Sequence, residues 1–468
     1  MIPTSKQLLL QEEVVLYNNI AKIDNCEGRL MVELEIYPVP RIVWEFETID
    51  NSNYNLPHLG QPINSCLGHL FSLNKAVITG ETLSMYHFAL EKRRGSSLEA
   101  IYNSLEEVAH SFTFYLTNTK FLESNQLLKL KQGQGLEQGQ PLVIEFSYNQ
   151  TWTISLIIKK EALEWLNPEN RNRGTLITAQ GEIWQKNLAE IARNNENDLP
   201  NLSLTEVKNI FNNFAWFLSY ANGGYTAPLF IEGQRLFDKP AIYPVCALAS
   251  QYKTTPLEQL SVSWITPCSD LEKYIERFST FERMIQNSLW KDTFDFTLIQ
   301  YFQATQHYMA WPVRASAIGA ALERLSYAIL VEDETNPAQK SKIDLLFDIT
   351  KTGQAKQTWN LGKKPGQEHI SVTGKRLRLM LERIGLTPCR GYNDINDVPE
   401  FLEVRNDAVH PRVSSMTKER RWQLIDQGIQ WIDEILLWRL GYSDKYLDRS
   451  QRKSITPRYD LSLRNSSW

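Results

Sequence analysis

The sequence of 468 residues lacks the cysteine pattern of a zinc site or of a disulfide-stabilised domain. Its five cysteines are scattered, and no two of them form a Cys-x-x-Cys pair. Isolated cysteines are typical of proteins that fold in a reducing compartment, so we expect a cytoplasmic protein without a bound metal. The cysteines are Cys26, Cys66, Cys246, Cys268 and Cys389.

Long apolar runs are missing as well. No stretch reaches the roughly 20 apolar residues that a membrane-spanning helix requires, and residues 1–12 contain no apolar core of the signal-peptide kind. We therefore expect no membrane partner. Hydrophobic residues still make up 42% of the chain, which is enough for ordinary cores, and the length predicts roughly two or three domains.

Familiar catalytic and nucleotide-binding motifs are also absent. The sequence contains no phosphate-binding loop, no dinucleotide-binding glycine motif, no His-Glu-x-x-His and no Gly-x-Ser-x-Gly. We therefore expect no cofactor. The net charge of −4 creates no general attraction for nucleic acid, so any bound RNA must be held by a local basic patch.

The spacing of apolar residues changes along the chain from period two to the period of a helix. Residues 30–47 and 144–158 alternate as strands do, with Asn149-Gln150 as a hairpin turn, and a short helix is expected from Ser97 to about Ala109. From about residue 270 the spacing is helical. These patterns predict an α+β fold in which a β-rich N-terminal half precedes an all-α bundle. The expected parts are a β-rich domain at 1–160, a mixed α/β segment at 161–268 that can continue the first domain, a helical bundle at 269–445 and a polar tail at 446–468.

Capping signals and apolar stripes predict where individual elements lie. Ser203-Leu204-Thr205-Glu206 is a capping box that begins a helix, and Gly223-Gly224 ends it. Ser269 or Asp270 begins a helix that runs to about Trp290, and a longer helix with a kink at Pro312 follows from Phe294 to Val331. Further helices are expected at 342–349, 375–385, 398–409 and 417–440, short strands at 226–231, 240–247 and 259–265, and a low-complexity loop at 132–140.

Arg405, Asn406 and His410 stand together on the last turns of one predicted helix. Asn406 and His410 are four residues apart and therefore share a helical face, and the long Arg405 side chain can bend toward the same end. Pro411 disfavours a helical conformation at His410, which places the imidazole at the helix end, where the dipole favours its protonated form. A titrating imidazole, a permanent cation and an amide at one place are what cleavage of a phosphodiester requires.

The motif Arg405-Asn406-x-x-x-His410 resembles the Arg-polar-x-x-x-His signature of the HEPN superfamily, many of whose members are metal-independent ribonucleases of defence and toxin systems. The resemblance covers roughly the last 170 of the 468 residues. It implies a helical bundle, an RNA substrate, and a homodimer through the C-terminal helices in which two motifs face each other. The run from Tyr220 to Gly233 resembles central segments of bacterial and phage proteins that carry a YopA-central-type module of unknown role.

A basic segment precedes the motif. From Lys351 to Arg390 the chain has nine basic and two acidic residues. The loop before the helix expected at 375–385, together with the polar side of that helix, either holds an RNA backbone or forms an ordinary solvated face. Glu323-Arg324, on the expected long helix, either forms an ion pair at the edge of the core or braces the motif. The candidate RNA-binding residues are Lys363, Lys364, Lys375, Arg376, Arg378 and Arg383.

Three functions are compatible with these signals. The first is a HEPN-like, metal-independent endoribonuclease of bacterial defence or toxin biology, whose β-rich region senses or recruits. The second is a non-catalytic HEPN-like module that dimerises or binds nucleotide in an adaptor protein. The third is an unrelated helical protein in which the motif is a coincidence. Because Trp422, Trp431 and Trp438 exceed what one helix face usually buries, we also expect an interface there.

Overall fold

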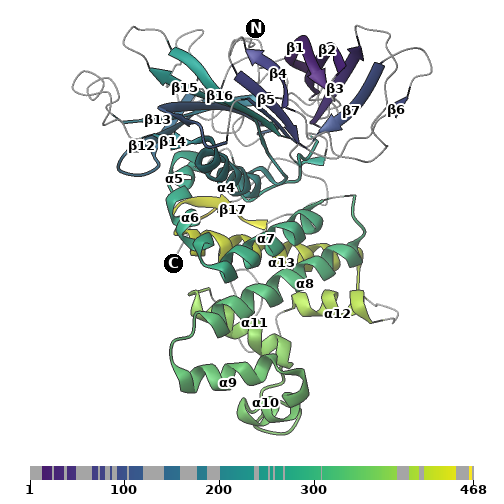
Figure 1. Ribbon diagram of the computed structural model, residues 1–468. Helices are drawn as coiled ribbons and strands as arrows, with labels where there is room; N and C mark the ends of the chain where they lie inside the picture. The colour runs from purple at the N-terminus through teal and green to yellow at the C-terminus, as the bar shows by residue number, and fades with distance from the viewer. Residues whose placement is uncertain are drawn as a thin grey trace. The chain divides into compact units, whose positions relative to one another are not determined.

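The computed structural model has helices and antiparallel sheets, which confirms the α+β class (Figure 1). The chain divides into two compact units, Met1–Leu260 and Ser261–Trp468. The residues that the structure describes are 13–23, 26–35, 40–48, 66–71, 74–79, 85–86, 92–97, 99–102, 105–119, 142–158, 177–186, 201–236, 242–250, 253–256, 259–266, 269–306, 308–386, 400–410, 416–449 and 463–465.

The first unit contains a nine-stranded antiparallel sheet. The predicted hairpin at its edge is confirmed, since β11 pairs with β12 and the Asn149 side chain accepts hydrogen bonds from the backbone N–H groups of Thr151 and Trp152. Strands from before and after residue 160 alternate in this sheet. Its order is β11 (Leu142–Ser147), β12 (Trp152–Ile158), β13 (Ile177–Gln185), β10 (Ser111–Thr117), β15 (Pro228–Leu236), β16 (Ile242–Ser250), β8 (Glu99–Tyr102), β5 (Asn74–Thr79) and β4 (Cys66–Phe71).

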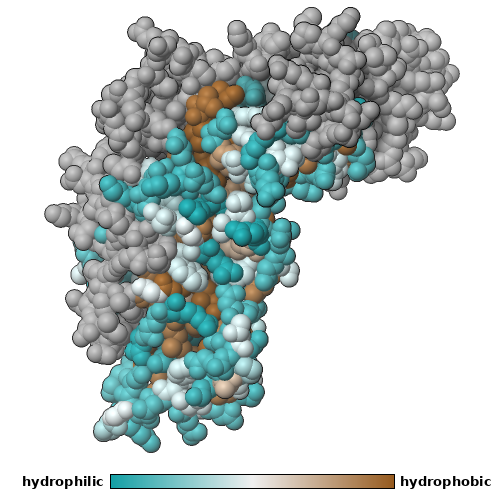
Figure 2. Space-filling view, turned by 90° about the vertical axis from the view of Figure 1, so that its left-hand side faces the viewer, coloured by the Kyte–Doolittle hydropathy of each residue, from teal (hydrophilic) through white to brown (hydrophobic). Residues whose placement is uncertain are grey.

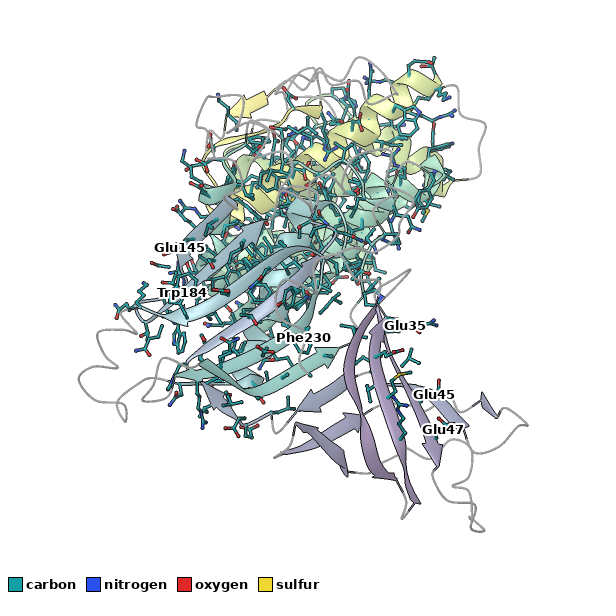
Figure 3. The ribbon with its side chains drawn as sticks, turned by 90° about the horizontal axis from the view of Figure 1, so that it is seen from above. Glu35, Glu45, Glu47, Glu145, Trp184 and Phe230 are labelled. Atoms are coloured by element: carbon teal, nitrogen blue, oxygen red, sulfur yellow. The ribbon has the colours of Figure 1, made fainter. Side chains whose placement is uncertain are left out.

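A five-stranded sheet is formed by the N-terminal strands. The register pairs Arg29 with Glu47 and Glu35 with Arg41, so opposite charges face each other across neighbouring strands. Figure 3 labels Glu35, Glu45 and Glu47 on this sheet, and Glu145, Trp184 and Phe230 on the larger one. The order is β1 (Glu13–Ile23), β2 (Cys26–Glu35), β3 (Arg41–Thr48), β7 (Lys92–Ser97) and β6 (Met85–Tyr86); β9 (Val108–Ala109) and β14 (Leu202–Ser203) form a separate short pair.

Helix α4 (Leu204–Asn222) packs on the nine-stranded sheet. Ser203 and Glu206 form the predicted capping box, and Gly223 ends the helix in the left-handed conformation with φ of 71°. The Phe211 ring lies 3.9 Å from that of Phe114 on β10, measured between centroids. Gly181 makes room for this stack, because a Cβ atom there would lie 2.0 Å from the Phe114 ring.

The predicted helix from Ser97 to Ala109 is wrong. Residues Glu99–Tyr102 are strand β8, which pairs with β5 on one side and β16 on the other, and Val108–Ala109 is strand β9. Pairing on both edges provides hydrogen-bond partners for more of the backbone N–H and C=O groups of β8 than an isolated helical turn would. The predicted strand at 259–265 is likewise absent among its described residues, and the loop at 132–140 lies outside the described residues.

The second unit is built mainly from helices, and its apolar core lies among α7, α8, α12 and α13. The last two helices begin and end close to their predicted limits. The elements are α5 (Leu271–Ile275), α6 (Phe278–Gln286), α7 (Ser288–Thr305), α8 (Trp311–Tyr327), a π-helical turn (Ala328–Glu332), α9 (Pro337–Phe347), a 3-10 turn (Ile349–Lys351), α10 (Thr352–Thr358), α11 (Val372–Arg383), α12 (Phe401–Val409) and α13 (Lys418–Leu440).

The predicted long helix with a kink at Pro312 is instead two helices. α7 ends at Thr305, and α8 begins at Trp311 with Pro312 in its first turn. Proline lacks a backbone N–H and its ring obstructs the preceding turn, so it fits a helix start better than a helix interior. Asp270 begins the first helix as predicted, but the stretch to Trp290 is divided between α5, α6 and the start of α7.

The segment after α13 is not the polar, irregular tail that the sequence predicted. Lys445–Leu447 is strand β17, paired with β18 (Leu463–Asn465). The Arg449 guanidinium is buried and donates to the Asp433 carboxylate on α13 at 2.9 Å, to the carbonyl of Val262 and to the Tyr301 hydroxyl. A buried charge requires such partners, and they attach this segment to the helices.

The surface of the second unit that is visible in Figure 2 is mostly hydrophilic or neutral, with one narrow hydrophobic strip. No helix in the described part of the chain has both the length and the apolar composition that a membrane crossing requires. Large exposed apolar side chains of this unit include Phe296, Ile299, Tyr308, Val313, Ile349 and Val409.

The contact of α13 with α8 and α12 provides a test of the packing. A Cβ atom at Gly428 would lie 2.5 Å from Cγ2 of Ile318 and 2.7 Å from Cδ2 of Phe401. Gly428→Ala should therefore lower the unfolding free energy by about 1–3 kcal/mol, although helix propensity alone favours alanine by about 1 kcal/mol. Calorimetry would measure the change. Gly353→Ala on α10 is the control, because nothing lies within 4 Å of its Cβ position, and it should be neutral or slightly stabilising.

Candidate functional site

The motif lies at the end of α12, where the sequence predicted it. α12 ends at Val409, and His410 follows as its C-cap in an extended conformation, with φ of −107° and ψ of 128°. The His410 side chain is exposed, whereas Phe401, Leu402 and Val404 on the same helix are buried. The helix is therefore anchored by its first turn and presents its last turn to solvent.

Arg405 points from α12 onto α8. Its Nη2 atom lies 3.1 Å from Oε1 of Glu323, and both side chains remain partly exposed, at 29% and 37%. Its aliphatic part lies over Gly319, where a Cβ atom would be only 3.1 Å from Cγ of Arg405. Of the two roles considered for Glu323, the structure shows a direct ion pair with the motif arginine.

Asn406 connects the arginine and the histidine of the motif. Its Oδ1 atom accepts a hydrogen bond of 3.4 Å from Nη1 of Arg405, and its backbone carbonyl accepts one of 3.0 Å from the backbone N–H of His410. The amide thus orients the guanidinium while the helix backbone positions His410. An exposed imidazole and an oriented cation at one helix end can act on an anionic group that approaches from solvent.

Arg376 on α11 belongs to the same cluster. Its Nε atom donates to the carbonyl of Leu346 at 2.7 Å. Its guanidinium lies over the Phe347 ring, with 4.7 Å between Cζ and the ring centroid. Burial lowers the pKa of Arg376; Glu323 opposes the shift, and the like charge of Arg405 adds to it. Of these two arginines, Arg405 forms the ion pair with Glu323, and Arg376 is affected by both charges at longer range.

The other candidate RNA-binding residues are in different surroundings. Lys363 and Lys364 are exposed in the loop before α11. Lys375 and Arg378 do not project into solvent as the polar-face pattern suggested; both are buried and form ion pairs with Glu368. Helical spacing alone misses this arrangement, because the loop that carries Glu368 folds back against α11.

Arg383, at the end of α11, is also engaged within the protein. Its Nη1 atom donates to the carbonyl of Ile329 at 2.8 Å, and its Nη2 atom forms an ion pair with Glu334. Arg383 therefore attaches α11 to the segment that follows α8. Among the six basic candidates, Lys363, Lys364 and Arg383 are exposed, and Arg383 differs from the two lysines because its guanidinium is engaged in these contacts.

The three tryptophans of α13 do not form one exposed surface. Trp431 is buried, and its ring centroid lies 6.5 Å from that of Phe401. Trp422 is half-buried, and the Cζ atom of Arg314 lies 4.4 Å from its ring centroid. Trp438 is half-buried. Trp431 is thus part of the core, and of the three tryptophans Trp422 and Trp438 remain candidates for an interface.

One component of the site could have been read more fully from the sequence. Gly319 and Glu323 are four residues apart in a predicted helix, so they share a face. A glycine in a helix interior is unfavourable by about 1 kcal/mol relative to alanine and often marks a close approach. That pattern indicates where another element crosses α8, although it does not identify Arg405 as the neighbour.

Comparisons with protein-family models, with curated proteins and with solved structures find no match for this chain. The HEPN resemblance therefore rests on the motif and its helical setting. Within the described residues, His, Cys, Asp and Glu side chains form no group of three that could hold a metal ion.

The ion pairs of Glu368 provide a test of whether the α11 cations have a structural role. Burial disfavours its ionised form, but hydrogen bonds and charges from Lys375 and Arg378 outweigh this and hold the pKa of Glu368 below its ordinary value. Glu368→Gln should destabilise the protein by about 1–2 kcal/mol at neutral pH. This value is low for hydrogen bonds between charged groups, because the carboxylate is partly exposed.

The pH dependence of this difference follows from the direction of the shift. A lowered folded-state pKa contributes stability above the ordinary value of 4.5, and the contribution is lost as the pH falls through the lowered pKa. Denaturant unfolding at several pH values should show the wild type losing its advantage over Glu368→Gln only below about pH 4.5. Equal stability of the two proteins at pH 7 would contradict this assignment.

Proposed function

We propose that this chain is a HEPN-like, metal-independent endoribonuclease that acts in the cytoplasm, in bacterial defence or toxin biology. The observation that supports the proposal is the helix end itself, where His410 is exposed and Asn406 orients an Arg405 that Glu323 holds in place. The β-rich first unit would sense a trigger or recruit the target.

The proposed reaction is cleavage of the RNA backbone by its own 2′-hydroxyl. His410 removes the proton from the hydroxyl as general base, or donates a proton to the departing 5′-oxygen as general acid. Arg405 stabilises the negative charge that builds up on the pentacovalent phosphorus centre. Asn406 orients Arg405 through the contact between its Oδ1 atom and Nη1. The products are a 2′,3′-cyclic phosphate and a 5′-hydroxyl end.

A complete site needs a group for each proton, and one chain carries one such motif. We infer a homodimer through the C-terminal helices, with the two His410 side chains facing one groove, as the HEPN resemblance implies. Val409, directly before His410, is 45% exposed and is an apolar group that a partner would cover.

A non-catalytic module that dimerises or binds nucleotide in an adaptor protein is the second candidate. The Arg405–Glu323 ion pair favours this second candidate, because Glu323 neutralises part of the positive charge of Arg405 that catalysis would use. In that case the helix end would bind an anion or a partner without chemistry.

Substitution of the motif tests the catalytic proposal. His410→Ala and Arg405→Ala should each reduce RNA cleavage by about 10²–10⁴-fold. His410→Ala should leave the thermal unfolding temperature unchanged, because His410 is exposed, whereas Arg405→Ala should lower it slightly, because Arg405 packs over Gly319 and pairs with Glu323. Cleavage should persist in the presence of EDTA. His369→Ala is the matched control, since His369 is an exposed histidine of the same unit outside the motif, and it should retain full activity.

Wild-type protein that cleaves no RNA, or cleavage that His410→Ala leaves intact, would contradict the ribonuclease proposal. Loss of cleavage only after chelation would contradict its metal independence.

The dimer is tested by sedimentation velocity or light scattering at micromolar concentration. We expect a mass of twice 54.2 kDa. A mixture of His410→Ala and Arg405→Ala chains would further show whether sites are shared between subunits. A strict monomer, with and without RNA, would remove the composite site and favour the non-catalytic module.

A further inference from the structure

The loop at residues 360–368, before α11, is closed by hydrogen bonds of its own backbone. The backbone N–H of Glu368 donates to the carbonyl of Asn360 at 3.0 Å, and the Asn360 side-chain amide donates to the carbonyl of Gly366 at 2.9 Å. Gly366 has a φ of 81°, a left-handed conformation that glycine adopts without strain. The backbone of this loop is therefore fixed, and two exposed lysines lie between its ends: Lys363 and Lys364.

The acidic residue of this loop is used inside the protein. The Glu368 carboxylate forms ion pairs with Lys375 and Arg378, which are both buried on α11. These two cations already offset the negative charge of Glu368. It therefore attaches the loop to α11 and does little to neutralise the two exposed lysines.

Two further lysines are placed beside the loop by hydrogen bonds. The backbone N–H of Leu361 donates to the carbonyl of Lys356 on α10 at 2.8 Å, and Nε1 of Trp359 donates to the carbonyl of Lys342 on α9 at 3.0 Å. Figure 1 shows α9, α10 and α11 together at one end of the second unit. We define the lysine surface as the four exposed residues Lys342, Lys356, Lys363 and Lys364.

The charges of the lysine surface are not neutralised by neighbouring side chains. None of its four ammonium groups forms a hydrogen bond or an ion pair with a residue that the structure describes. Residues 336–370 contain six lysines and three acidic residues. Of the three, Asp348 pairs with Lys351 and Glu368 pairs with α11, which leaves Asp344. The surface is thus locally positive in a chain whose net charge is −4.

The chemistry of the lysine surface favours a polyanion over a folded protein or a membrane. Interfaces between proteins are depleted in lysine and enriched in aromatic residues. In the fully described range 336–370, Ile349 is the one large apolar side chain that is exposed, whereas binding in a membrane interface requires an apolar face. A phosphate backbone, by contrast, is bound mainly through lysine and arginine.

We propose that the lysine surface binds the phosphate backbone of RNA. The phosphate chemistry rests on the four lysines, and the identification of RNA rests on the proposed nuclease function. The fixed loop holds Lys363 and Lys364 next to each other before RNA arrives, so binding requires little ordering of the backbone. None of the four lysines belongs to the motif at the end of α12, so they contribute binding and leave the chemistry to the motif.

The experiment measures binding of a labelled 2′-O-methyl RNA oligonucleotide to the full chain by fluorescence anisotropy at several salt concentrations. This probe cannot undergo cleavage by its own 2′-hydroxyl. The double variant Lys363→Gln, Lys364→Gln removes two phosphate contacts, so it should weaken binding by about ten-fold near 0.1 M salt and reduce the log–log salt slope by about 1.4. The double variant Lys342→Gln, Lys356→Gln should lower both quantities in the same direction.

A control variant removes the same amount of charge from elsewhere in the second unit. Lys273 and Lys291 are both exposed; Lys273 pairs with Asp444 at 3.3 Å, and the charge of Lys291 acts on Asp295. The double variant Lys273→Gln, Lys291→Gln should keep the affinity within about two-fold of the wild type and leave the salt slope unchanged. The thermal unfolding temperature of every variant identifies a loss of folding.

The outcomes separate this inference from the nuclease proposal. Lower affinity and a smaller salt slope in the lysine-surface variants alone would support the inference, whether or not the protein cleaves RNA. Unchanged binding in both of these variants would overturn it, even if His410→Ala abolished cleavage. An equal loss in the control variant would overturn it as well, because net charge would then explain the binding.

Competition identifies the class of partner. A glutamate-rich peptide and phosphatidylserine vesicles, each at the same total negative charge as the oligonucleotide, should displace it poorly. Displacement by either one as effective as by unlabelled RNA would assign the lysine surface to an acidic protein or to a membrane, and would overturn the assignment to an RNA backbone.

Discussion

The close approach of α8 to α12 and α13 is the constraint on which the candidate site depends. Two glycines allow it, since Gly428 leaves space for Ile318 and Phe401, and Gly319 leaves space for the Arg405 side chain. Because α12 can lie this close to α8, Arg405 reaches Glu323 across the helix interface. The ion pair then determines the direction of the guanidinium, which on a flexible side chain would otherwise be spread over many rotamers.

Charge inside the helical unit is the second organising feature. Arg449 is buried against Asp433, and Lys375 and Arg378 are buried beside Glu368. Each buried charge needs a partner, because its transfer from water is costly when it remains unpaired. Most of the basic residues in and around α11 are therefore used to hold segments together. A high content of lysine and arginine in a stretch of sequence does not measure the positive field at its surface.

Ion pairs between arginine and a carboxylate occur both in the candidate site and in the core of the helical unit, but they differ in how far they are exposed to solvent. The Arg449–Asp433 pair is almost fully buried, whereas Arg405 and Glu323 remain partly accessible to solvent. A buried pair cannot be exchanged without a large desolvation cost, but a partly exposed pair can exchange its anion for another. This difference separates a cation that belongs to the scaffold from one that a ligand can reach.

Local signals in the sequence were sufficient for the features that depend on a few neighbouring residues. The capping box at Ser203, the hairpin at Asn149 and the place of His410 at a helix end were all predicted, because each depends on bonds within about one turn of chain. Only the tertiary structure decided that Glu99–Tyr102 is a strand, that Lys375 is internal and that Glu323 meets Arg405. These outcomes depend on partners from other elements of the fold. A pattern of local spacing contains no information about which distant residue will lie opposite.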